Sequence, residues 1–146
     1  MSEPAPVAAL AHIAIATREA DTLAQTLVAA LGARRGAEEL LDGGALRVVF
    51  VHLGPVTLEL LEPQSDAHTV AKFLESRGPG LHHVALEVTD LTARLAAAKA
   101  SGARLIDEHG RPGAHGSTVA FLHPKSFGGV LLELCQPDAP KPPGAA

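Results

Sequence analysis

Apolar and polar residues alternate along two segments of the chain, and each segment carries a histidine at the same place. Residues 10–16 alternate around His12, and residues 82–88 repeat the pattern around His83. Alternation with a period of two is typical of a strand that has one covered face. We therefore predict a strand at each segment, with each histidine on the face opposite its aliphatic neighbours.

A helical spacing of leucines follows each predicted strand. The first helix is marked by leucines four residues apart and by a glycine stop, at Leu23, Leu27, Leu31 and Gly32. The second is marked by a favourable N-cap, by two leucines on one face and by a glycine stop, at Asp90, Leu91, Leu95 and Gly102. These signals predict two helices. Residues 68–77 predict a short third helix that links the two halves.

Three further strands are predicted in each half, near residues 33–39, 46–53 and 56–62 and near residues 103–108, 117–123 and 129–135. Each half is then a βαβββ module. The predicted fold class is α+β, with two tandem modules that form curved mixed sheets around one shared concave face. We predict a single domain, made of module one (8–66), a linking helix (67–79) and module two (80–137). Flexible termini are expected at residues 1–7 and 138–146.

The two halves resemble each other in sequence. Residues 10–15 match residues 81–86, and residues 48–52 match residues 119–123, both at an offset of 83 − 12 = 71 positions. A third match joins residues 58–63 to residues 132–137, at an offset of 133 − 59 = 74 positions. Three matches in the same order indicate an internal duplication, with the three extra residues accommodated in a loop.

Each repeat places one histidine on its first strand and one glutamate on its last. These four residues are His12, Glu59, His83 and Glu133. A carboxylate in an apolar strand costs on the order of several kcal/mol unless it is paired or binds a cation. A lone histidine on a strand is usually a core or rim residue, and a lone glutamate usually faces solvent. The recurrence of the same pair in both halves instead favours a shared site for a divalent metal such as Zn, Co, Ni or Fe.

Composition and charge narrow the class of protein. The 146 residues are 47% hydrophobic, enough for a core, and the net charge of −4 argues against a nucleic-acid partner. No apolar run approaches the roughly 20 residues that span a bilayer. The first residues lack the basic and apolar regions of a secretory signal. Cys135 is the single cysteine, so we expect no intrachain disulfide and a reducing, cytoplasmic location.

Over residues 10–136 the sequence resembles the methylmalonyl-CoA epimerases of the vicinal oxygen chelate superfamily, which includes glyoxalases, bleomycin resistance proteins and dioxygenases. The most specific stretches are LELLEP at 58–63, AKFLE at 71–75, GLHHVA at 80–85, VAFLHPKS at 119–126 and GVLLEL at 129–134. The resemblance implies epimerisation of the (R) and (S) forms of methylmalonyl-CoA through an enolate. It also implies an acyl-CoA substrate and a homodimer.

The resemblance implies that His12, Glu59, His83 and Glu133 are the metal ligands, although many family members carry glutamine at the position of Glu59. Co²⁺ is the expected ion, ahead of Zn²⁺, Ni²⁺, Mn²⁺ or Fe²⁺. Glu133 would also act as one of two proton-transfer groups. For substrate contacts the sequence offers Lys125 and His115, and Arg111 from a nearby loop.

The second proton-transfer group departs from the family pattern. Related epimerases have a glutamate where an ungapped comparison places Gly43, with Asp42 adjacent. Asp42 could take this role through a one-residue shift of the loop, or Glu38 or Glu39 could reach in. The Asp-Gly-Gly sequence is equally typical of a plain turn.

Three other functions fit the same pattern. A glyoxalase-type isomerase or lyase would share the metal site and the enolate chemistry. An iron-dependent extradiol dioxygenase would bind its iron with two histidines and one glutamate. The fourth protein ligand predicted in this chain would leave less room on the iron for oxygen and catechol together. A metal-free protein that binds a small molecule would need neither histidine.

Overall fold

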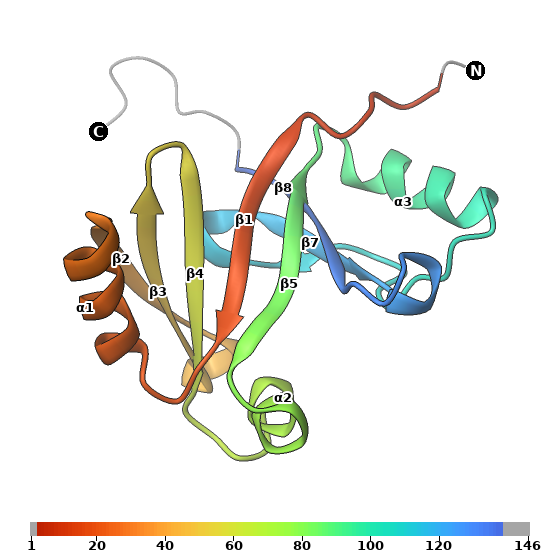
Figure 1. Ribbon diagram of the computed structural model, residues 1–146. Helices are drawn as coiled ribbons and strands as arrows, with labels where there is room; N and C mark the ends of the chain where they lie inside the picture. The colour runs from red at the N-terminus through yellow and green to blue at the C-terminus, as the bar shows by residue number, and fades with distance from the viewer. Residues whose placement is uncertain (1–2, 139–146) are drawn as a thin grey trace.

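The computed structural model describes residues 3–138, and its strands form one continuous curved sheet (Figure 1). Its elements are β1 (Ala9–Ala16), α1 (Ala20–Leu31), β2 (Arg34–Leu41), η1 (Asp42–Gly44), β3 (Leu46–Leu53), β4 (Val56–Pro63), α2 (Thr69–Arg77), β5 (Gly80–Glu87), α3 (Leu91–Ala100), β6 (Arg111–Pro112), η2 (Ala114–Gly116), β7 (Thr118–Leu122), η3 (Pro124–Ser126) and β8 (Leu132–Gln136). The strand order is β2-β3-β4-β1-β5-β8-β7-β6. The predicted α+β class with two tandem modules is confirmed.

The two modules join where the first strand of each lies beside the other. β1 pairs with β5 in the antiparallel sense, and each of them pairs in parallel with the last strand of its own module, β4 or β8. Around the pair Ile13↔Val84, His12 lies opposite Ala85 and His83 lies opposite Ala14. The duplication in the sequence is thus an approximate twofold relation in the sheet, with both histidines near the axis.

Alternating residues of the strands pack into two hydrophobic cores, one on each face of the sheet. Leu60 on β4 is fully buried with Ala20 and Ala24 of α1 on one face of the sheet. Leu61, the next residue, faces the other side and packs with Val70 of α2. The predicted helices are confirmed, but Leu31 is 63% exposed, because alanines of α1 rather than its last leucine make the close contact with the sheet.

The ends of the helices agree with the sequence signals. Gly32 closes α1 in the left-handed conformation (φ 69°), and the Asp90 side chain accepts a hydrogen bond from Ala93 N–H at the start of α3. Within the described residues, no helix is long and apolar enough to cross a membrane.

The N-terminal residues that were predicted to be flexible make a specific contact where the structure describes them. Arg94 of α3 donates hydrogen bonds to the carbonyl oxygens of Pro4 and Ala5. Residues 1–2 and 139–146 of the predicted flexible termini lie outside the described residues. The predicted boundaries of the modules stay predictions.

The strand predicted at residues 103–108 is wrong. Only an isolated bridge between Leu105 and Leu122 forms there, and the first strand of this trio is the two-residue β6 instead. The Asp107 side chain accepts a hydrogen bond from the Phe121 N–H. The Phe121 carbonyl oxygen accepts hydrogen bonds from the N–H groups of both Ile106 and Asp107. Because a side chain occupies the donor that a neighbouring strand would use, a regular ladder cannot extend there.

The last strand of each module caps the helix that follows the first strand. Glu62 Oε2 accepts a hydrogen bond from Ala20 N–H at 2.8 Å, and Gln136 Oε1 accepts one from Leu91 N–H at 2.8 Å. The bond satisfies a helix N–H that has no partner within the helix. The pairing of Glu62 with Gln136 in the repeat therefore has a structural cause.

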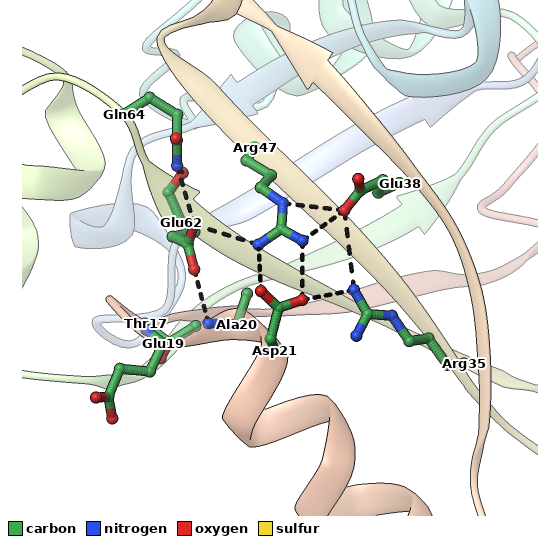
Figure 2. Close-up of polar contacts among 9 residues, drawn as sticks. All are labelled: Thr17, Glu19, Ala20, Asp21, Arg35, Glu38, Arg47, Glu62 and Gln64. Atoms are coloured by element: carbon green, nitrogen blue, oxygen red, sulfur yellow. Dashed lines mark hydrogen bonds and ion pairs between the residues drawn. The ribbon is translucent and has the colours of Figure 1, made fainter.

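In module one this cap is extended into a charged cluster around Arg47 (Figure 2). The Arg47 guanidinium lies 2.9 Å from Asp21 Oδ1, 2.6 Å from Glu38 Oε2 and 3.3 Å from Glu62 Oε1. Arg35 reaches the same Asp21 oxygen at 2.7 Å. Asp21 stands in the first turn of α1, so the cluster joins the start of this helix to β2, β3 and β4.

The Asp21 carboxylate gives this cluster a pH dependence. Hydrogen bonds from Arg47 and then from Arg35 lower the pKa of Asp21 from 3.8 to about 2. A lowered pKa in the folded state adds stability that is complete above the unfolded pKa and is lost as the pH falls through the folded pKa. We expect Asp21→Asn to reduce the free energy of unfolding at pH 7, and this reduction to shrink as the pH falls from about 4 toward 2.

Urea denaturation at several pH values measures this difference. Asp66→Asn is the control, because Asp66 is exposed and makes no ion pair with the described residues. A loss of stability at Asp21→Asn that stays constant down to pH 2 would contradict the ion-pair origin.

Candidate functional site

Two rows of side chains cross the middle of the sheet, and each row is a copy of the other. One row runs over β3, β4, β1 and β5 through Phe50, Glu59, Ala14 and His83. The other runs over β7, β8, β5 and β1 through Phe121, Glu133, Ala85 and His12. Directly paired residues of neighbouring strands point to the same face of a sheet. All four candidate ligands therefore lie on one face, separated by small alanines.

Three of the four candidate ligands converge. His12 Nε2 lies 3.1 Å from His83 Nε2 and 3.4 Å from Glu133 Oε1, and His83 Nε2 lies 3.7 Å from Glu133 Oε2. One ligand atom from each residue fits within 4.8 Å of the others. All three residues are buried, so the group forms a compact, water-poor set of two imidazoles and one carboxylate.

Glu59 lies on the far side of His12. Its Oε2 is 2.8 Å from His12 Nδ1, the ring nitrogen that points away from His83 and Glu133. A carboxylate on the second nitrogen of a histidine fixes the orientation of the ring and raises its basicity as a metal ligand. The geometry supports this orienting role directly, and the expectation that Glu59 is itself a ligand stays a prediction.

Burial and neighbouring charges set the ionisation of the group. Burial opposes the charge of His12, but the hydrogen bond with Glu59 and the charges of Glu59 and Glu133 outweigh it and raise the His12 pKa. Burial, and then the charge of His12, lower the His83 pKa to about 2. Burial raises the Glu133 pKa to about 7. The neutral His83 ring has an unprotonated nitrogen, the form in which imidazole binds a metal.

One buried oxygen tests whether these residues suit a cation. Among residues 3–138, no hydrogen bond reaches Glu133 Oε1, although this atom is inaccessible to solvent. A buried carboxylate oxygen without a partner is unfavourable unless a cation or a ligand meets it. Two imidazole nitrogens lie beside this oxygen, and such a donor set suits a divalent first-row metal. The residues fit the metal that the sequence predicts.

The three converging residues line a cavity of about 400 Å³ in the concave face of the sheet. Asp42 and His68 line the same cavity, at the turn after β2 and at the start of α2. His68 Nε2 is 2.7 Å from Asp42 Oδ2. Glu133 from β8 and Asp42 from η1 thus line the same cavity from different modules, and Glu59, Glu87 and Asp138 line it as well.

Of the three carboxylates that could replace the glutamate expected at Gly43, Asp42 alone lines the cavity among the described residues. Glu38 pairs with Val49 and bonds Arg47 on the α1 side of the sheet. Glu39 accepts a hydrogen bond from the His115 backbone N–H at 3.0 Å. Gly43 itself offers no side chain.

The predicted substrate-contact residues differ in position. His115 lines the cavity, with its ring centroid 4.3 Å from that of Phe50, so a loop of module two covers a strand of module one. Lys125 lies in η3 and does not line the cavity, so its contact with substrate stays a prediction without structural support. Arg111 is the single lysine or arginine among the described lining residues, and its guanidinium lies over Phe121.

Two lining residues were missed by reasoning from the sequence. The sequence places His68 only at the start of the helix predicted at 68–77, although a residue that caps a helix could have been singled out there. Alternation along a strand places neighbouring residues on opposite faces, yet His82 Nδ1 lies 2.8 Å from His83 Nδ1. No local pattern signals either contact, because each depends on how the strand and loop bend.

Comparison with known proteins gives one consistent result. The family model of the Glyoxalase/Bleomycin resistance protein/Dioxygenase superfamily matches residues 11–121. The ethylmalonyl-CoA/methylmalonyl-CoA epimerase of Cereibacter sphaeroides is 39% identical over 130 residues, which cover 87% of this chain and 96% of that protein.

The solved structures that this chain resembles point to the same family as the sequence comparisons. The methylmalonyl-CoA epimerase of Mycobacterium tuberculosis has a TM-score of 0.87 at 33% identity and covers 95% of this chain and 94% of its own. A Streptomyces coelicolor methylmalonyl-CoA epimerase in complex with 2-nitronate-propionyl-CoA has a TM-score of 0.84 at 30% identity and covers 92% of this chain and 100% of its own.

Proposed function

The chain belongs to the methylmalonyl-CoA epimerase family of the glyoxalase/bleomycin resistance protein/dioxygenase superfamily, and from this premise we propose that it interconverts (R)- and (S)-methylmalonyl-CoA. The observation that carries the proposal is the pair of carboxylates on one cavity, Glu133 beside two imidazoles and Asp42 on the other module. Inversion at a carbon needs a proton-transfer group on each of its two faces.

The chemistry divides between Glu133 and Asp42. One carboxylate breaks the C–H bond α to the thioester and takes the proton, and the electron pair stays on the substrate as an enolate. The other carboxyl group returns a proton to the opposite face, which completes the inversion. The two groups exchange roles when the reaction runs from the other enantiomer.

His12, His83 and Glu133 would hold the divalent metal, with Glu59 as a fourth ligand or as the residue that orients His12. When bound, such a cation stabilises the negative charge that develops on the thioester oxygen. The choice of Co²⁺, the homodimer and the cytoplasmic location rest on the resemblance and composition of the sequence and stay predictions.

Arg111 is the residue that we assign to the free carboxylate of the malonyl group. It is the single described arginine or lysine on the cavity, and it lies with its Cζ 5.2 Å from the centroid of the Phe121 ring. Phe121 pairs with Glu133 across β7 and β8, so the guanidinium stands close to the reacting end of the cavity. A guanidinium binds a carboxylate with two parallel hydrogen bonds.

Proton exchange with solvent tests the proposal. We expect methylmalonyl-CoA incubated in D₂O with the purified protein to gain one deuterium at the α carbon and to invert, because the abstracted proton exchanges before a new one is returned. Mass spectrometry follows the label, and chiral chromatography follows the inversion. A reaction without protein corrects for spontaneous exchange.

A second substrate distinguishes the epimerase from the glyoxalase-type alternative. The hemithioacetal of methylglyoxal and glutathione should not turn over, since the cavity is proposed to bind an acyl-CoA. Turnover of the hemithioacetal without deuterium gain in methylmalonyl-CoA would overturn the assignment.

A dioxygenase is the second candidate, and one observation favours it. With Glu59 bonded to His12, the converging set is two histidines and one carboxylate, which is also the ligand set of non-haem iron oxygenases. Ring cleavage of a catechol by protein loaded anaerobically with Fe²⁺ tests this alternative. The epimerase proposal requires that no cleavage occurs.

A further inference from the structure

His68 is held at a fixed orientation by the start of α2. Its Nδ1 accepts a hydrogen bond from Val70 N–H at 3.1 Å, so the side chain caps the helix. A ring nitrogen that accepts a hydrogen bond carries no proton, and the neutral imidazole must then carry its proton on Nε2. The cap therefore sets the tautomer of His68 as well as its position.

The Nε2–H group of this tautomer points at Asp42. Nε2 lies 2.7 Å from Asp42 Oδ2, a short charge-assisted distance. Within residues 3–138 no hydrogen bond reaches the second oxygen, Oδ1, of Asp42. His68 thus holds one oxygen of the carboxylate and leaves the other available on the cavity that both residues line.

Asp42 needs such a restraint. Its backbone is left-handed (φ 54°), and Gly43 and Gly44 follow with φ of 67° and 92°. A left-handed aspartate is uncommon and carries a backbone strain that the surrounding contacts must hold. The Asp42 side chain is 55% exposed, whereas that of His68 is 12% exposed. Without its bond to the partly buried, helix-anchored His68, a carboxylate on this exposed, glycine-rich turn would sample many directions.

We propose that His68 is a positioning residue, which orients Asp42 as the second proton-transfer group of the epimerase. This inference rests on the function proposed above. The C–H bond of the substrate breaks, its proton passes to Asp42 Oδ1, and the electron pair stays on the substrate. His68 keeps its own proton throughout and bonds Oδ2. Glu133 returns a proton from the opposite face, and the reverse reaction reverses each transfer.

The alternative is that His68 only caps α2. His68→Asn separates the two roles, because asparagine accepts a hydrogen bond at an N-cap but is too short to reach Asp42. The chain offers a matched control in module two. His123 Nδ1 accepts a hydrogen bond from Lys125 N–H at 3.1 Å in the same way, but His123 does not line the cavity. His123→Asn should leave the kinetics unchanged.

We expect His68→Asn to lower kcat by about 10- to 100-fold with little change in KM, since a misdirected proton-transfer group slows the chemical step without weakening substrate binding. The double variant Asp42→Asn with His68→Asn should be no slower than Asp42→Asn alone, because His68 acts through Asp42. Multiplied effects in the double variant, or an unchanged kcat in His68→Asn, would overturn the proposal.

Imidazole NMR gives a readout that does not depend on activity. In ¹⁵N-labelled protein, His68 should show the Nε2–H tautomer, and its Nε2–H proton should shift upfield in Asp42→Asn. An Nδ1–H tautomer, or a resonance that Asp42→Asn does not move, would overturn the pair even in an active enzyme. If these signals appear as expected but wild-type protein fails to exchange or invert methylmalonyl-CoA, the proposed function fails and the catalytic role of His68 falls with it.

Discussion

Replacing Glu133 by glutamine is expected to lower the rate constant of epimerisation by about 10²- to 10⁴-fold, the usual contribution of a general acid–base group. Glutamine has the same shape and keeps one carbonyl oxygen, but it cannot take up a proton. Glu133 is 6% exposed and its Oε1 has no hydrogen bond from the described residues, so the substitution removes charge rather than packing. Steady-state kinetics with each enantiomer measures the effect.

Isotope exchange distinguishes the two carboxylates. If Glu133 serves one face and Asp42 the other, Glu133→Gln should still exchange the α proton of one enantiomer, and Asp42→Asn should exchange that of the other. Neither variant should invert the carbon. Glu75→Gln, at an exposed site on α2, is the control and should match wild type. Near-normal inversion by Glu133→Gln would remove Glu133 from the mechanism.

The sequence predicts the centre of this site because the site follows from a periodic pattern and a repeat. Alternation on β1 and β5 fixes which face each histidine takes, and the duplication requires the two faces to coincide. The register of β1 against β5, with His12 opposite Ala85 and His83 opposite Ala14, is the structural form of that repeat. Small alanines between the ligands are part of the same pattern, since a larger side chain there would separate them.

What the sequence could not predict depends on single side chains that interrupt a regular pattern. The strand predicted at 103–108 does not form, because the side chain of the single residue Asp107 accepts the hydrogen bond of the Phe121 N–H. The pair of His68 and Asp42 joins two turns 26 residues apart, and neither turn has a periodicity that would place the other. The position of Glu59 on His12 Nδ1 depends on a side-chain rotamer.

Loss of both histidines is expected to abolish metal binding. We expect wild-type protein to hold about one divalent ion per chain by elemental analysis after dialysis. His12→Ala/His83→Ala should hold none, because the carboxylates of Glu59 and Glu133 without an imidazole do not retain such an ion. Bound metal should also raise the melting temperature of wild type, and added Co²⁺ should not raise that of the double variant. His109→Ala, on an exposed loop, is the control.

The metal titration also decides the role of Glu59. If Glu59 only orients His12 through the 2.8 Å contact with Nδ1, Glu59→Ala should keep one ion per chain and weaken its affinity by about 10- to 100-fold, as is usual for partners of metal-bound histidines. Loss of the ion at Glu59→Ala would make Glu59 a ligand instead. A wild-type chain that binds no divalent ion, together with a double histidine variant that still binds an acyl-CoA, would favour the metal-free binding protein. The buried Glu133 Oε1 would then have to meet the bound molecule instead of a cation.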